Sequence, residues 1–126
     1  MNAPFRLLIT GVFAASLLAG CAGMELDEAE KTKPTGTGFG AAAYKEYIDL
    51  AKFEFREGDY RSSDHYALKA MAAAKAQPVN PDPVAMRQLP QDTVGEITGA
   101  HTRLVKAMDA GGRDRQPALA ARAQAM

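Results

Sequence analysis

The chain has 126 residues, and its 15 basic and 15 acidic side chains give a formal charge of zero at neutral pH. This length suits one small domain, and a hydrophobic fraction of 47% is ordinary for a globular protein. Nucleic-acid-binding proteins normally carry a basic face, whereas the charges here are interspersed, so no nucleic-acid partner is expected. The single cysteine, Cys21, excludes an internal disulfide.

Residues 1–20 have the layout of a secretory signal peptide. A short segment with one positive charge, Arg6, precedes the uncharged run LLITGVFAASLLAG, which ends in small residues. A membrane-spanning helix needs about 20 apolar residues, and this run is shorter and contains two glycines. The pattern therefore favours a signal peptide over a permanent membrane-spanning anchor.

The end of this segment, Leu18-Ala19-Gly20-Cys21, closely resembles the bacterial lipobox. In that motif the cysteine sulfur receives diacylglycerol and the chain is cleaved ahead of the cysteine. The resemblance implies a lipoprotein cleaved between Gly20 and Cys21. Each buried methylene contributes about 0.8 kcal/mol and a single acyl chain binds only marginally, so two or three chains on Cys21 would hold the protein. Ala22 stands where an aspartate favours the inner membrane, so the resemblance implies the outer membrane, facing the periplasm. The alternative is an ordinary signal peptide that ends in these residues by chance.

Residues 21–40 are predicted to be the lipidated cysteine and a flexible linker. The sequence AGMELDEAEKTKPTGTGFG that follows Cys21 offers almost no bulky apolar side chain to bury. A random coil of this length would have a root-mean-square reach of about 25 Å. Its glycines, Gly36, Gly38 and Gly40, precede a helical pattern, but a phosphate-binding loop needs a preceding strand that this sequence does not predict.

Two helices are predicted over residues 41–57 and 60–76. Gly58 provides a stop between them, and Asp59 provides a cap for the second helix. All aromatic residues after Cys21 lie between Phe39 and Tyr66, so this hairpin is expected to hold the firm part of the core. The expected apolar face is Tyr44, Tyr47, Ile48, Ala51 and Phe55 on the first helix, and Ser63, Tyr66, Ala67, Ala70 and Ala74 on the second.

Two further helices are predicted after a proline-rich connection. Residues 77–91 contain four of the seven prolines, which precludes a continuous helix. A capping box at Thr93-Val94-Gly95-Glu96 is expected to open a third helix that Gly111 and Gly112 end. A fourth begins between Asp114 and Pro117 and runs to Met126 without a stop signal. The predicted fold class is therefore all-α, a small bundle of about four helices over residues 41–126, whose second half leans on the first hairpin.

The first hairpin also carries a family resemblance. Leu50-Ala51, Gly58-Asp59-Tyr60 and Ala70 are similar to part of a tetratricopeptide repeat. The pattern departs from that repeat at Ser63, where an alanine is usual, and at Ala67, where an aromatic is usual. Such arrays need about three units to bury their faces. One partial copy implies a repeat-like hairpin and not a repeat protein.

A second resemblance covers most of the chain. A lipobox, the segment EYIDLAKFEFREGDYRSSDHYALKAMAAAK, a proline-rich spacer and the segment LPQDTVGEITGAHTRLVKAMDAGGRDRQPALAARAQAM resemble the N-terminal portion of alphaproteobacterial outer-membrane lipoproteins of the OmpA family. In that family this portion precedes a peptidoglycan-binding domain, which these residues lack, so no wall-binding residue is assigned. The resemblance implies a structural role that links the membrane to the wall. The alternative is a tetratricopeptide-like adaptor that binds another envelope protein.

Residues 62–65, Ser-Ser-Asp-His, include the residue types of a hydrolase triad. Adjacent residues on a helix point about 100° apart, so these side chains are not expected to converge. Cap-forming residues at a helix start explain the cluster, and His65 is expected to be solvated. His101 lies on an apolar face and is expected to be a half-buried, hydrogen-bonded histidine rather than a ligand. We expect no enzyme activity, cofactor or metal site.

Leu50 and Phe53 are the candidate partner contacts. Phe53 falls on the side of its helix opposite to Tyr47 and Phe55, where a two-helix hairpin leaves it exposed. The interpretation we favour is that a third helix of the chain covers Phe53. The alternative is that another protein does.

Overall fold

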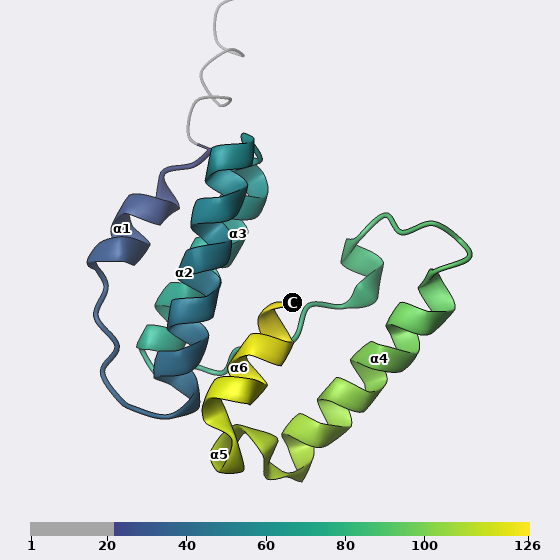
Figure 1. The fold of residues 1–126 in the computed structure, drawn as a ribbon. Coiled ribbons are helices and arrows are strands. Elements are labelled where there is room, and N and C mark those ends of the chain that lie inside the picture. The colour runs from purple at the N-terminus through teal and green to yellow at the C-terminus, as the bar shows by residue number, and fades with distance from the viewer. Residues whose placement is uncertain (1–21) are drawn as a thin grey trace, which may run out of the picture.

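The computed structural model describes residues 22–126, and this part of the chain is helical with no strand. The all-α class expected from the sequence is confirmed. Figure 1 shows α2 and α3 side by side as a hairpin, with α1 on one flank, α6 on the other and α4 standing apart. The helices are α1 (Glu25–Lys31), α2 (Phe39–Glu57), α3 (Tyr60–Ala74), α4 (Val94–Ala107), α5 (Arg113–Arg115) and α6 (Pro117–Ala125), with a 3₁₀ turn η1 (Val84–Met86) and a wide turn η2 (Met108–Gly112).

The turn between α2 and α3 forms as the sequence predicts. Gly58 takes the left-handed conformation, with φ at 81°, and closes α2. The carboxylate of Asp59 accepts a hydrogen bond from the Ser62 backbone N–H at 3.0 Å, which caps α3. Hydrogen bonds from Ser62 also hold the pKa of Asp59 below its ordinary value. The predicted stop and cap are both confirmed.

The core of the hairpin is built from two stacked tyrosines and many small residues. Tyr47 is 1% exposed and Tyr66 5%, and their ring centroids lie 6.2 Å apart with an angle of 14° between the planes. Small residues let the backbones approach, and the buried Ser63 donates its hydroxyl hydrogen bond to the Ala51 carbonyl at 2.9 Å. Phe55, which the sequence predicts on the same apolar face, is 40% exposed in the last turn of α2, so that part of the prediction is wrong. The prediction that aromatic residues of this hairpin hold the core is confirmed for Tyr47 and Tyr66. The small buried residues around them are Ala43, Ala51, Ala67, Ala70 and Ala73.

Residues 25–31 form a packed helix where the sequence predicts a flexible linker. Leu26 and Ala29, three residues apart on one face of α1, are buried in the core. The acidic side chains in the first turn of α1 stabilise the helix, because they lie near the partial positive charge at its N-terminal end. The Asp64 carboxylate accepts hydrogen bonds from the Gly23 and Glu25 backbone N–H groups at 2.7 and 3.1 Å. The linker expectation is wrong here because one leucine and one alanine, with a cap from another helix, suffice to hold a short helix.

Further contacts hold the rest of this segment against the hairpin. The Tyr44 hydroxyl donates to the Ala29 carbonyl at 3.0 Å, so the partly buried Tyr44 fastens α1. The backbone N–H and the hydroxyl of Thr35 both donate to the Ala74 carbonyl, at 2.9 and 3.0 Å. The chain between α1 and α2 therefore follows the surface of the bundle.

In the second half of the chain, α6 packs on α2. The buried Gln124 donates from its amide nitrogen to the Tyr47 hydroxyl at 2.9 Å and to the Val79 carbonyl at 3.1 Å. Pro117 occupies the first turn of α6, where its missing N–H costs nothing, as the sequence predicts. The expectation that the second half leans on the hairpin is confirmed for α6.

Helix α4 differs from the other long helices because none of its residues is buried. It begins where the sequence predicts, but the capping box does not form, since the Thr93 hydroxyl donates to the Pro90 carbonyl at 2.9 Å instead of capping the helix. At its other end η2 carries the chain toward α5, and Gly111, with φ at 90°, breaks the helix there. The long helix α4 is thus attached to the bundle through its two ends.

Candidate functional site

A groove of about 510 Å³ lies between α4 and the rest of the molecule. One wall is α4, and the other is made by the proline-rich connection, the end of α6 and Tyr66 of α3. In Figure 1 this is the region between α4 and the hairpin toward which α6 points its C-terminal end. The volume lies within the range of small-ligand pockets, about 300 to 1,000 Å³.

The α4 wall is one face of that helix. Ile97, Ala100, His101 and Leu104 recur at the spacing of helical turns and all line the groove. Ile97 is 43% exposed, although it lies on the most apolar face of α4. The opposite wall is also largely apolar, with Tyr66, Val84, Leu89, Ala123 and Met126 among its lining residues. Such a surface suits an apolar occupant.

Two polar atoms of groove-lining residues are buried without a hydrogen-bond partner among the described residues. They are Nε2 of His101 and Oε1 of Gln124. A buried polar atom left unpaired costs about 1 to 3 kcal/mol, so each of these two atoms lowers the stability of the groove walls. His101 is partly buried, as the sequence predicts, but its expected hydrogen bond at Nε2 is not present in residues 22–126.

The wall formed by the proline-rich connection is held in place by Asp82. Its carboxylate lies 2.6 Å from the Lys69 ammonium and 2.9 Å from Nε2 of His65, and both of these residues belong to α3. Burial alone raises the pKa of Asp82, but the hydrogen bonds from Lys69 and His65 outweigh it and hold that pKa below its ordinary value. We call this set of three side chains the Asp82 latch. The sequence predicts a solvated His65, and this prediction is wrong. His65 is half-buried because it bonds to Asp82.

The latch is extended by contacts from neighbouring residues. The Lys69 ammonium also donates to the Asn80 carbonyl at 2.9 Å and lies 4.9 Å from the centre of the Tyr47 ring. The Asn80 side chain accepts from Arg113 at 3.2 Å. The proline-rich segment is thus fastened to α3 on one side and to the α5 region on the other, although it contains no regular hydrogen-bonded helix before η1.

The four side chains of residues 62–65 point to four different partners. Ser62 bonds to Asp59, and Ser63 bonds to the Ala51 carbonyl. Asp64 accepts the amides at the start of α1, and His65 meets Asp82. The expectation that these adjacent residues do not converge is confirmed.

The groove does not include the residues that the sequence suggested as partner contacts. Leu50 is partly buried against the core, and Phe53 is 50% exposed. The favoured interpretation that a third helix covers Phe53 is wrong, because α6 packs on α2 and still leaves Phe53 half exposed. The predicted lipobox, formed by Leu18, Ala19, Gly20 and the predicted lipidation site Cys21, lies outside the described residues.

The positioning roles of Asp64 and Asp82 do not follow from the sequence pattern. Both make their contacts with segments far away in sequence: Asp64 with residues 23 and 25, and Asp82 with α3. The only local signal for Asp82 was its place between Pro81 and Pro83, in a stretch held extended. Neither pairing follows from helical periodicity.

Within residues 22–126, three or more histidine, cysteine, aspartate or glutamate side chains do not gather in an arrangement that would hold a metal ion. None of the helices described there combines the length and the apolar character needed to cross a bilayer. Comparison with known proteins finds no matching family model, no matching curated protein and no matching solved structure.

Proposed function

We propose that this protein is a lipid-anchored lipoprotein of the outer membrane, facing the periplasm, with a structural role in the envelope. The observation that carries the proposal is the lipobox-like sequence Leu18-Ala19-Gly20-Cys21 at the end of an uncharged run. The acyl chains on Cys21 supply the membrane anchor. The helical module that follows is the membrane-proximal part of an OmpA-family protein, in which a further domain would hold peptidoglycan.

The fold is consistent with a spacer of fixed shape. Helix α1 begins at Glu25, four residues after Cys21, and packs on α2 and α3. Helix α6 then packs on the other flank of α2. A packed bundle of this kind would keep the distance between the membrane and the wall more constant than a random coil would.

The anchor is tested by metabolic labelling with palmitate. The native protein should incorporate label and sediment with outer-membrane vesicles, and the Cys21→Ala variant should do neither. Ala22→Ser, one residue further along, serves as the matched control and should be labelled like the native protein. Equal labelling of the native and Cys21→Ala proteins, or no labelling of either, would contradict the anchor.

The groove beside α4 favours a second function, that of an adaptor for another envelope protein. Its largely apolar walls suit the apolar face of an amphipathic segment of a partner. The reading frame downstream of Met126 distinguishes the two functions. A frame that continues into an OmpA-like domain supports the structural role, and a stop codon at that point supports the adaptor.

A further inference from the structure

The point at which the described chain begins is rigidly attached to the bundle. The Asp64 carboxylate on α3 accepts the Gly23 N–H at 2.7 Å and the Glu25 N–H at 3.1 Å. Gly23 has φ at 92°, and a Cβ there would lie 3.1 Å from the Tyr60 ring and 3.2 Å from the Phe55 ring. A residue with a Cβ would be strained in this backbone conformation and tight against both rings. The chain is therefore pinned to the tip of the α2–α3 hairpin two residues after Cys21.

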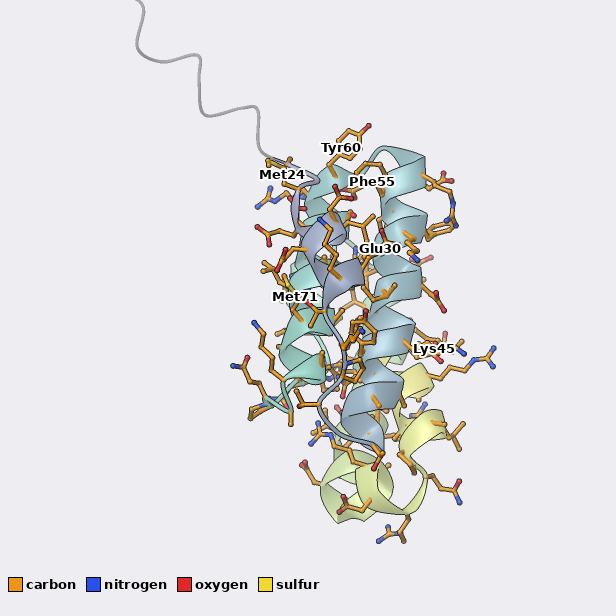
Figure 2. All side chains as sticks on the ribbon, turned by 90° about the vertical axis from the view of Figure 1, so that its left-hand side faces the viewer. Met24, Glu30, Lys45, Phe55, Tyr60 and Met71 are labelled. Atoms are coloured by element: carbon orange, nitrogen blue, oxygen red, sulfur yellow. The ribbon has the colours of Figure 1, made fainter. Side chains whose placement is uncertain are left out.

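The same tip exposes a cluster of apolar side chains. Phe55 is 40% exposed, Tyr60 45% and Met24 64%. The rings of Phe55 and Tyr60 meet edge to face, with centroids 5.0 Å apart. Figure 2 shows these three labelled side chains together at the end of the bundle where α2 meets α3. We call Met24, Phe55 and Tyr60 the apolar tip.

We propose that the apolar tip docks directly on the phospholipid surface that holds the acyl chains of Cys21. This inference rests on the proposed lipidation. Two residues span at most about 7 Å, because each adds no more than about 3.6 Å. A lipid on Cys21 therefore brings Gly23, and with it the apolar tip, to the membrane surface. A flexible linker would instead have let the module stand off by about 25 Å.

The chemistry of the tip fits the interface between headgroups and acyl chains. Aromatic side chains concentrate at that depth, where an apolar ring and a polar hydroxyl such as that of Tyr60 are both accommodated. The charged residues that flank the tip in sequence have both signs with an excess of acids, so the surface is suited to zwitterionic rather than anionic headgroups. They are Glu25, Glu54, Arg56, Glu57, Asp59 and Arg61.

The docking is measured by tryptophan fluorescence, because the chain contains no tryptophan. Tyr60→Trp places an indole in the apolar tip. Leu119→Trp is the control, because Leu119 is 64% exposed and lies in the first turn of α6. Figure 1 shows α6 away from the end of the hairpin at which α2 meets α3. Each variant is purified with its lipid and reconstituted in phosphatidylcholine vesicles that contain lipids brominated near the headgroup end of the acyl chain.

We expect the Tyr60→Trp indole to lose most of its emission to the brominated lipid and to shift to shorter wavelength, and the Leu119→Trp indole to do neither. Adding Asp64→Ala to Tyr60→Trp should restore much of the emission, since it frees Gly23 and Glu25 while leaving the lipid in place. Equal emission from the two indoles in lipidated protein overturns the docking and leaves the anchor intact. Protein whose mass shows no lipid on Cys21 overturns the proposed function and the docking with it.

Discussion

The bundle formed by α1, α2, α3 and α6 differs from α4 in how deeply its apolar side chains are buried. In the bundle, small side chains and stacked tyrosines bury one another, and Tyr47 is 1% exposed. In α4 the apolar residues recur just as regularly, yet none is buried. A helical pattern therefore predicts that a helix forms, but packing depends on whether a complementary surface lies within reach. The bundle should carry the stability of the described chain, and α4 should contribute little to it.

The largest effect is expected from Tyr47→Ala. The substitution removes a buried ring that stacks on Tyr66, together with a hydroxyl that accepts a hydrogen bond from the Gln124 amide. Truncation of a buried aromatic costs about 3 to 5 kcal/mol. Phe53→Ala, on the same helix but 50% exposed, should stay within about 0.5 kcal/mol of wild type. Urea unfolding followed by circular dichroism measures both, and equal losses would contradict our assignment of the buried face of α2.

A pair of isoleucines compares the two regions directly. Ile48 is 7% exposed in the bundle, whereas Ile97 is 43% exposed on α4. Ile48→Ala should lower the free energy of unfolding by about 2 to 5 kcal/mol. Ile97→Ala should lower it by less than about 1 kcal/mol, since little apolar area is returned to water. If both variants lost the same stability, α4 would have to be packed as tightly as α2.

The Asp82 latch should make the free energy of unfolding depend on pH. Because the pKa of Asp82 is lowered in the folded protein, its stabilising contribution is complete above the ordinary aspartate pKa, about 3.9, and is lost as the pH falls through the lower folded-state value. Asp82→Asn should cost about 1 to 3 kcal/mol at neutral pH. The difference in free energy of unfolding between Asp82→Asn and wild type should shrink below about pH 4. Asp92→Asn, at an exposed loop position, should match wild type throughout.

Structure that depends on contacts between residues close in sequence could be predicted, and structure that depends on distant contacts could not. Periodicity and caps predicted α2, α3, the Gly58 stop and the buried face around Tyr47, because these depend on neighbouring residues. The α1 helix, the Asp82 latch and the groove depend on partners tens of residues away, such as Asp64 for Gly23. Phe53 is a further example. The sequence correctly placed it on the side of α2 away from Tyr47, but α6 packs on another part of α2 and leaves Phe53 half exposed.

The smallest effects are expected from two glycines. A Cβ on Gly40 of α2 would lie 2.9 Å from the Ala73 carbonyl oxygen, whereas one on Gly95 of α4 would meet nothing within 4 Å. Gly40→Ala should therefore lower stability by about 1 kcal/mol, despite the better helix propensity of alanine. Gly95→Ala should stabilise α4 by up to about 1 kcal/mol and leave the melting temperature of the bundle unchanged. Thermal melts measure the effect of both substitutions on the bundle, and amide exchange measures the stabilisation of α4 by Gly95→Ala. A rise in melting temperature for Gly40→Ala would contradict the close approach of α2 and α3.

Amide hydrogen exchange of the native protein, resolved by residue, tests most directly the division between the bundle and α4. Amides in α2, α3 and α6 should exchange slowly and with similar protection, because they open only when the shared core opens. Amides in α4 should exchange much faster, because that helix can open without exposing buried residues. Protection in α4 equal to that in α2 and α3 would contradict the account, since it would make α4 part of the same cooperative unit.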